Sequence, residues 1–297
     1  MRQLIAVDWG TSSLRAALLD GRGQVLDQRS LPRGILTVPA GEFPGVLAAA
    51  TAQWAQGATL YLLSGMAGSR QGWLEAPYCP CPAGLADVAA RLAWVEPGRV
   101  AIVPGLSCEP GGVPDVMRGE ETQIFGALKL LDRSDGVFVL PGTHSKWARV
   151  TAGRITSFST FMTGEFYALL RQHSILSRTL PPAEGELDLV AFERGVGYAI
   201  QSGNLLHAAF SARTLSLFDR MPAQVLPSYL SGLVIGEELR SQEFAGDGAG
   251  LIVVGTDALT ARYRLALQVL GIPAVVAGAE ATWRGSWEIA QILEGIE

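Results

Sequence analysis

The sequence predicts an α/β protein built from two similar lobes, and three observations support this fold class. The chain has 297 residues, enough for one large or two ordinary domains. Its hydrophobic fraction of 48% is sufficient for sizeable cores and excludes disorder. A strand–turn–strand pattern near the N-terminus recurs later in the same register, and a repeat of this length indicates paired lobes rather than a solenoid.

The first copy of the pattern is a β-hairpin with an acid at its tip. The apolar run 4–7 predicts a buried strand that ends at Asp8. Gly10 allows the chain to turn, and Thr11 and Ser12 offer hydroxyl and backbone N–H groups. Such a tip suits a phosphate group, with the carboxylate holding Mg²⁺ through its water shell. Asp and Gly are also common in plain turns, so the first copy alone leaves both interpretations open.

The second copy has the same layout 132 residues later (142 − 10, for example). It comprises an apolar run, a Gly-Thr-x-Ser turn, a second apolar run and a Gly-Arg turn. Two such hairpins facing each other across a cleft would hold the β- and γ-phosphates of ATP from both sides. The corresponding pairs are Gly10 and Gly142, Thr11 and Thr143, Ser13 and Ser145, Gly21 and Gly153, and Arg22 and Arg154.

Composition and charge argue against several classes of protein. The net charge of −5 makes a nucleic-acid partner unexpected. No apolar run reaches the roughly 18 residues of a membrane span, and we expect no signal peptide. Three cysteines, an odd number, favour reduced thiols and a cytoplasmic location. We therefore expect a cytoplasmic protein that acts on small molecules; a homodimer is compatible with the sequence, which does not specify an oligomeric state.

Apolar runs and helical spacing predict the remaining elements. A breaker cluster at 109–114 is where we place the boundary between lobes 1–112 and 113–297. The end of the chain, 281–297, is expected to carry a last helix that crosses back to the first lobe. The other expected strands are 25–30, 34–38, 59–63, 100–103, 155–161, 251–254 and 275–277. The expected helices are 43–56, 85–92, 120–131, 166–172, 190–210, one or two within 215–243, 258–270 and 281–292.

The start of the helix expected at 120–131 carries several charged residues. Acids in a first helical turn usually complement the helix dipole, which accounts for one of Glu120 and Glu121. It does not account for Arg118, because a cation is disfavoured at the positive end of a helix. An arginine can clamp a carboxylate with two parallel hydrogen bonds. Asp115 is expected to cap the helix.

Five short motifs carry a resemblance to a known family: residues 6–10, 116–123, 141–147, 161–165 and 255–263. They span nearly the whole chain and resemble 2-dehydro-3-deoxygalactonokinase, a family with the two-lobed actin/hexokinase-like (ribonuclease H-like) fold. The Met-Arg-Gly-Glu-Glu-Thr and Pro-Gly-Thr-His motifs are specific to it. The resemblance implies an ATP cleft between the lobes. It also implies transfer of the γ-phosphoryl group to the 6-hydroxyl of 2-dehydro-3-deoxy-D-galactonate, in galactose or galactonate breakdown.

The resemblance implies a role for individual residues, with ATP and Mg²⁺ as cofactors. Asp8 would hold Mg²⁺, and Glu120 would be the catalytic base, with Glu121 or Glu165 as alternatives. Arg118 would bind the carboxylate of the sugar acid. The residues expected to bind ATP are Gly10, Thr11, Ser12, Arg15, Gly142, Thr143, His144, Lys146, Gly255, Thr256 and Gly278. Those expected to bind the sugar acid are Arg118, Glu121, Glu165 and Gly65.

Other functions remain open at this point. A kinase for another sugar or sugar acid, such as 2-dehydro-3-deoxygluconate, would use the same machinery, because one inverted hydroxyl changes only a few hydrogen bonds. A non-catalytic ATP-binding regulator would need neither a base nor a carboxylate clamp. A phosphohydrolase is a third alternative. Two side chains also keep two interpretations each: Glu165 caps its helix or binds substrate hydroxyls, and Lys146 binds the γ-phosphate or pairs with an acid.

Overall fold

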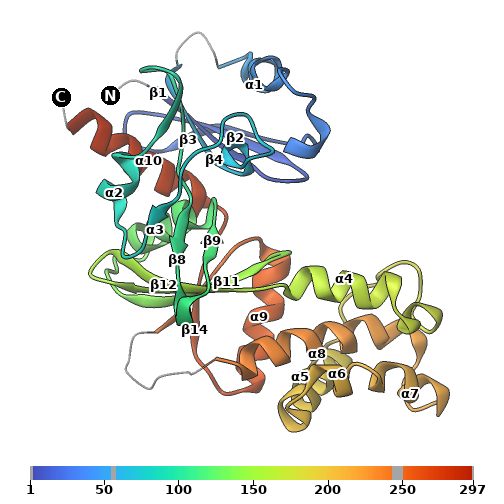
Figure 1. Ribbon diagram of the computed structural model, residues 1–297. Helices are drawn as coiled ribbons and strands as arrows, with labels where there is room; N and C mark the ends of the chain where they lie inside the picture. Colours follow the sequence, from blue (N-terminus) through green and yellow to red (C-terminus); the bar gives the residue numbers. More distant parts are fainter. Residues whose placement is uncertain (1–2, 55–57, 243–249, 296–297) are drawn as a thin grey trace. The chain divides into compact units, whose positions relative to one another are not determined.

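The computed structural model describes residues 3–54, 58–242 and 250–295 (Figure 1). By its contacts the chain divides into two compact units. Unit 1 comprises Met1–Phe138, Trp147–Ser159 and Ala277–Glu297, and unit 2 comprises Val139–Lys146 and Thr160–Val276. The borders of these units differ from the boundary expected near residue 112. The division into lobes 1–112 and 113–297 stays a prediction.

Unit 1 contains a six-stranded sheet of order β3-β2-β1-β4-β7-β6. The first three strands pair antiparallel, β4 is parallel to β1 and to β7, and β6 is antiparallel at the edge. The N-terminal hairpin predicted from the sequence is therefore confirmed. The strands are β1 (Gln3–Trp9), β2 (Leu14–Leu19), β3 (Val25–Leu31), β4 (Ala58–Gly65), β6 (Ala93–Glu96) and β7 (Val100–Ile102).

Helices cover this sheet because β1 is apolar on both of its faces. Ile5, Val7 and Trp9 share one core with Phe43 of α1, and the rings of Trp9 and Phe43 meet edge to face at 5.3 Å. Helix α10 packs against β1, β2 and β4, and also against α2 and α3. These helices are α1 (Phe43–Thr51), α2 (Leu85–Ala89), α3 (Glu120–Leu130) and α10 (Glu280–Gly295). A small sheet of order β5-β8-β9 consists of β5 (Cys79–Pro80), β8 (Leu106–Cys108) and β9 (Asp115–Met117).

A second sheet has the order β12-β11-β10-β13-β14. It repeats the arrangement of the first sheet: the three strands of the hairpin pattern stand in the order third, second, first, and the next strand along the chain follows, β4 in the first sheet and β13 in the second. The repeat predicted from the sequence is thus confirmed at the level of topology. Its strands are β10 (Gly136–Leu140), β11 (Ser145–Thr151), β12 (Arg154–Phe161), β13 (Leu251–Val254) and β14 (Ala274–Ala277).

Helices make up most of unit 2, and Figure 1 shows α4 to α8 gathered together. Helix α8 is their centre, since it packs on α4, α5, α6 and α7 and is buried nearly all round. An acid in this helix, Glu238, is 3% exposed. The helices are α4 (Thr163–His173), α5 (Leu189–Ser202), α6 (Leu205–Ala208), α7 (Ser211–Leu217), α8 (Leu226–Arg240) and α9 (Asp257–Val269).

Three predictions of local structure are wrong. Residues 34–38 contain a 3₁₀ turn, η1 (Ile35–Thr37), because Ile35 N donates to Gly10 O instead of joining a sheet. The helix expected at 190–210 breaks at Gly203, whose left-handed φ of 62° ends α5. Asp115 lies in β9 and does not cap α3, whose start uses other acids.

Some predictions extend beyond what the structure describes. Residues 55–56 of the helix expected at 43–56 lie outside the described residues, as do residue 243 of the helical stretch 215–243 and residues 296–297 of the chain end. Within the described part of 215–243, helix α8 begins only at Leu226, after a 3₁₀ turn η5 (Ala223–Val225).

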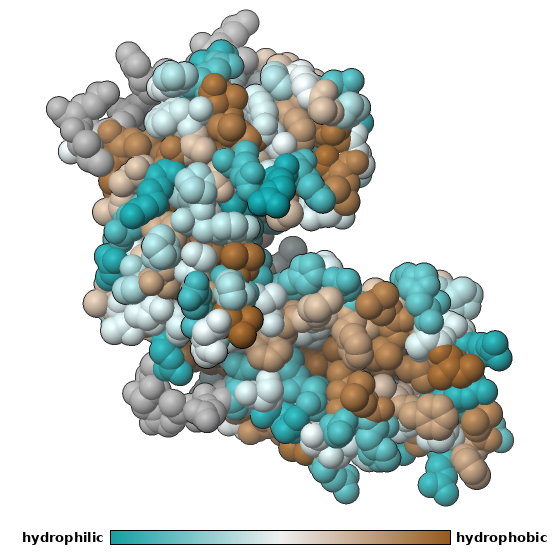
Figure 2. Space-filling view, viewed as in Figure 1, coloured by the Kyte–Doolittle hydropathy of each residue, from teal (hydrophilic) through white to brown (hydrophobic). Residues whose placement is uncertain are grey.

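The helical part of unit 2 exposes large apolar side chains, and hydrophobic residues show on its surface in Figure 2. Leu206 is 84% exposed and Phe218 is 71% exposed. Contiguous apolar patches mark interaction surfaces, whereas singly exposed apolar residues are common, so the homodimer remains a prediction. Among the helices that the structure describes, none combines the length and hydropathy needed to cross a membrane.

Candidate functional site

The first turn, residues 10–13, follows an acid that is paired with an arginine. Asp8 lies directly opposite Arg15 in the register of β1 and β2. Arg15 Nε donates to Asp8 Oδ2 at 3.1 Å, and Arg15 Nη2 donates to the same oxygen. Oδ1 of Asp8 accepts no hydrogen bond from the described residues, and the side chain is 15% exposed. A carboxylate with one uncommitted oxygen fits a role as a Mg²⁺ ligand.

Two glycines connect Asp8 with the start of α3. Gly65 ends β4 beside Trp9 of the parallel strand β1, and Gly119 precedes α3. Their φ angles of 84° and 102° belong to the region that favours glycine. A Cβ on Gly119 would lie 3.1 Å from Gly65 Cα, and a Cβ on Gly65 would lie 3.1 Å from Asp8 Oδ1. Asp8, near the end of β1, and the start of α3 therefore come close together at two residues that have no side chain.

The two glutamates at the start of α3 have different environments. Glu120 is partly buried, and its Oε2 accepts from the backbone N–H of Arg118 at 2.9 Å. Glu121 is fully buried; its Oε2 accepts from Gly119 N at 2.7 Å and its Oε1 accepts from Thr122 Oγ1 at 2.9 Å. Burial, and secondarily the charge of Glu120, raises the pKa of Glu121 to about 7. Glu121 supports the turn before α3, whereas Glu120 keeps surface for a ligand.

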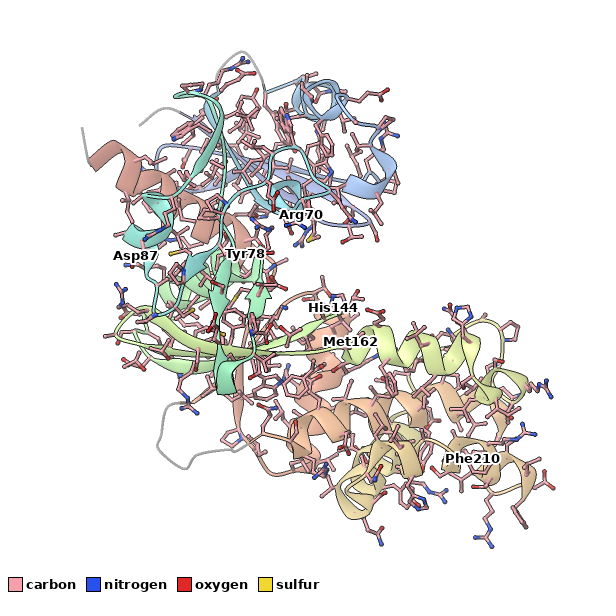
Figure 3. All side chains as sticks on the ribbon, viewed as in Figure 1. Arg70, Tyr78, Asp87, His144, Met162 and Phe210 are labelled. Carbon is pink, nitrogen blue, oxygen red and sulfur yellow. The ribbon has the colours of Figure 1, made fainter. Side chains whose placement is uncertain are left out.

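Arg118 lies against the segment that follows β4. Its guanidinium stands over the ring of Tyr78 at 4.4 Å, and Nη2 donates to Ala76 O at 2.8 Å (Tyr78 is labelled in Figure 3). Nε and Nη1 are buried and have no hydrogen-bond partner among the described residues. Buried donors normally have partners, so an anion would supply acceptors that this cation lacks.

Both turns present backbone N–H groups of the kind that bind phosphates. Thr11 and Ser12 are exposed, and their N–H groups make no hydrogen bond within the described part of the chain. The same holds for Thr143 and His144 in the second turn, residues 142–145. Consecutive unpaired N–H groups in a turn form an anion-binding concavity. Each turn thus fits the predicted binding of phosphate.

Each turn packs closely against a glycine that the sequence did not indicate as a site residue. A Cβ on Gly34, after β3, would lie 2.0 Å from Thr11 O, and a Cβ on Gly164, after β12, would lie 2.5 Å from Gly142 O. The residue after each glycine also donates its N–H to the turn, Ile35 to Gly10 O and Glu165 to Thr143 O, both at 3.0 Å. The available signal was a glycine shortly after the third strand in both repeats.

Other predicted residues of the second turn have partners within unit 2. His144 Nε2 lies 2.6 Å from Glu165 Oε2, a half-exposed pair that joins the turn to α4. Lys146 is 6% exposed, and its Nζ donates to Thr160 Oγ1 at 2.7 Å. The predicted contacts of these side chains with phosphate or substrate stay predictions.

The residues expected around adenosine fall in both units. Gly255 ends β13 in unit 2, and a Cβ there would lie 3.9 Å from Pro141 Cδ, next to the second turn. Thr256 directly precedes α9. Gly278 belongs to unit 1, and its N–H donates to Glu280 Oε1 at 3.2 Å. Their shared role at adenosine stays a prediction.

The described residues form no metal-ligand cluster and no reactive thiol, so Asp8 is the one candidate metal ligand among the predicted site residues. Within residues 3–54, 58–242 and 250–295, no three His, Cys, Asp or Glu side chains gather as a metal site. Cys79, Cys81 and Cys108 are free thiols. Burial raises the pKa of Cys81 to about 12, which makes this thiol a poor nucleophile. A Mg²⁺ ion would therefore depend on Asp8 together with phosphate and water oxygens.

The chain shares its fold with solved structures of the actin/hexokinase-like class, as the sequence predicted. One such structure is the activator of 2-hydroxyisocaproyl-CoA dehydratase from Clostridium difficile, solved with bound ADPNP. It superposes with a TM-score of 0.54 at 10% identity and covers 99% of this chain and 97% of its own. At this identity the likeness concerns the fold alone.

The chain belongs to the 2-keto-3-deoxy-galactonokinase family, whose sequence profile matches residues 8–289. The 2-dehydro-3-deoxygalactonokinase of Escherichia coli (strain K12) is 35% identical over 96% of this chain and 97% of that protein. A crystal structure from Sinorhizobium meliloti, described provisionally as a 2-dehydro-3-deoxygalactonokinase, has a TM-score of 0.88 and 35% identity, with 99% of both chains covered. The resemblance of the five motifs is thus confirmed.

Proposed function

We propose that this chain transfers the γ-phosphoryl group of ATP to the 6-hydroxyl of 2-dehydro-3-deoxy-D-galactonate. The observation that carries the proposal is the contact of Gly65 with Asp8 and with Gly119. It brings an acid suited to a metal–phosphate group close to Glu120, an acid suited to act as a base. Membership of the kinase family supports the reaction, and the name of the Escherichia coli relative supports the substrate.

In the proposed reaction, Glu120 accepts the proton of the 6-hydroxyl as its oxygen attacks the γ-phosphorus. The bridging oxygen of ATP leaves with ADP. The N–H groups of Thr11, Ser12 and Thr143 hold phosphate oxygens in place. When bound, Mg²⁺ neutralises negative charge on the phosphates, and Asp8 is the residue that would hold it.

The proposed role of Arg118 is recognition of the sugar-acid carboxylate. Its buried Nε and Nη1 lack partners among the described residues, and a carboxylate accepts hydrogen bonds from such nitrogens. The stacked Tyr78 and the bond to Ala76 O hold the guanidinium in one orientation. A kinase for a neutral sugar would have no use for this cation.

The decisive experiment measures ATP consumption with Mg²⁺ on a panel of 3-deoxy-2-keto sugar acids. We expect turnover on the galactonate compound and a fall of about 10²-fold or more in kcat for Glu120→Gln, with ATP binding retained. Glu109→Gln, at an exposed acid, is the matched control and should match the wild type.

Each contrary outcome selects an alternative. Preferred turnover on 2-dehydro-3-deoxygluconate would keep the reaction and replace the substrate. An active Glu120→Gln variant would move the base to Glu121 or Glu165, with Glu165 favoured because it is half-exposed while Glu121 is fully buried. Tight ATP binding without turnover on any sugar acid would indicate a regulator.

We further propose Mg²⁺ as the activating ion, a cytoplasmic location, and no nucleic-acid or membrane partner. The one uncommitted oxygen of Asp8 supports the metal. Chelation by EDTA should abolish turnover, and added Mg²⁺ should restore it. Turnover that persists in EDTA would contradict the metal.

A further inference from the structure

We infer that Glu238 is a positioning residue that holds the second turn, residues 142–145, in its phosphate-binding shape; this inference rests on the proposed function. Glu238 belongs to α8, a helix that supplies no residue to the predicted site. It is 3% exposed, so its carboxylate does not reach a ligand. Its influence on the turn passes through hydrogen bonds.

Three hydroxyl groups donate to this one carboxylate. Ser145 Oγ donates to Oε1 at 2.8 Å. Tyr263 OH donates to Oε2 at 2.6 Å, and Thr163 Oγ1 donates to the same oxygen. All four side chains are at most 9% exposed, and Ser145 is fully buried. The cluster lies entirely within unit 2.

Each donor belongs to a segment that is expected to face ATP or the sugar acid. Ser145 closes the second turn and begins β11. Thr163 begins α4, whose Glu165 N–H donates to Thr143 O at 3.0 Å. Tyr263 lies in α9, the helix that follows Thr256. One buried carboxylate thus joins the phosphate turn, the start of α4 and the helix at the predicted adenosine site.

The chemistry of the cluster requires a carboxylate. An ionised carboxylate only accepts hydrogen bonds, so it can satisfy three hydroxyl donors at once. Burial and the neighbouring charge of Glu238 raise the pKa of Tyr263 well above its usual value, so this phenol keeps its proton as a donor. An amide in place of the carboxylate would present an NH₂ group to a hydroxyl that now donates. That hydroxyl would have to turn from donor to acceptor, and the charge-assisted bonds to all three segments would become weaker neutral ones.

The first turn shows that this support is not a general requirement of the hairpin. Ser13, the counterpart of Ser145, is exposed. The next residue is the apolar Leu14, fully buried, where the second repeat has Lys146. A buried acid therefore supports the second turn and not the first, and its role is to hold residues 142–145 in place.

The test compares Glu238→Gln with Glu237→Gln, a matched change one residue earlier in α8. Glu237 pairs only with Arg240 among the described residues, at the surface. We measure the melting temperature, the Kd for ATP by calorimetry, and kcat and KM well below the melting temperature. For Glu238→Gln we expect a Kd for ATP raised by about tenfold and a kcat lowered by a similar factor. Glu237→Gln should match the wild type in all four.

A purely structural role would lower the melting temperature of Glu238→Gln and leave Kd and kcat of the folded enzyme unchanged; this result would overturn the inference. If Glu238→Gln does not fold, Tyr263→Phe and Ser145→Ala each remove one donor and should raise the Kd for ATP by about threefold. Unchanged Kd values in both would also overturn it. Failure of the proposed function has a different signature: wild-type protein that binds ATP and turns over no sugar acid.

Discussion

The two turns share a sequence pattern and differ in what stabilises them. The first turn follows Asp8, whose partner Arg15 is 27% exposed. At the second turn, the position that corresponds to Asp8 is Leu140, which is 3% exposed, and the buried Ser145 bonds to Glu238. The Asp8–Arg15 pair is only partly buried, whereas the Ser145–Glu238 bond belongs to a fully buried polar cluster, and such a cluster fixes geometry more firmly. If the proposed function holds, the first turn keeps its charge for chemistry and the second turn is held in place for binding.

The difference at Asp8 gives the largest expected effect. Asp8→Asn should lower kcat by about 10²–10³-fold, because it removes the proposed metal ligand while the turn remains. Leu140→Ile at the corresponding position should retain kcat within about threefold, since it keeps apolar volume. Steady-state kinetics with saturating ATP and Mg²⁺ measures both. Comparable losses of kcat in the two variants would contradict the idea that only the first turn carries a residue needed for the chemistry.

The two turns share a close contact with a glycine, and substitution of that glycine tests how much the contact contributes to stability. Gly34→Ala and Gly164→Ala should each lower the free energy of unfolding by about 3 kcal/mol or more, because a Cβ would meet turn backbone at 2.0 and 2.5 Å. Gly34→Ala should have the larger effect. Urea unfolding measures both. Gly45→Ala is the control: a Cβ there has no described atom within 4 Å, and alanine should stabilise α1 by up to about 1 kcal/mol.

The buried acid at the start of α3 predicts a pH dependence. Glu121 has a pKa of about 7 in the folded chain and an ordinary value of 4.5. Because the folded state keeps the proton longer, its contribution to stability is fully present below pH 4.5 and is lost as the pH rises to about 7. The loss is up to about 3 kcal/mol. Unfolding free energies across this range should fall less steeply in Glu121→Gln, and identical slopes would contradict the assignment.

The smallest expected effect concerns the exposed pair at the second turn. His144→Asn should raise the KM for ATP by about two- to fivefold, because a half-exposed pair with Glu165 holds the turn only weakly. Ser12→Ala, at the corresponding position of the first turn, should change KM less, since Ser12 has no side-chain partner among the described residues. A larger loss in Ser12→Ala would show that the first turn, not the second, has the greater share in ATP binding.

Local sequence determined the hairpins, the repeat and much of the remaining secondary structure. Apolar runs ended by Gly or Asp specify a strand and its turn within a few residues, so β1, β2, β13 and the start of α3 follow from neighbouring residues alone. The short strands β5, β6, β8 and β9 escaped prediction, because each contains a proline or a polar residue, whereas the equally short β7, β13 and β14 are uninterrupted apolar runs.

Only the tertiary structure decided what supports the site. Glu238 is an acid in an apolar helix, and its partners Ser145 and Thr163 are 93 and 75 residues away in the sequence. Gly34 looks like any loop glycine until the first turn lies against it. Glu120 and Glu121 are identical residue types, and burial alone separates a base candidate from a supporting acid. A hydrogen bond or a close approach depends on positions in space, which a linear pattern of residue types does not contain.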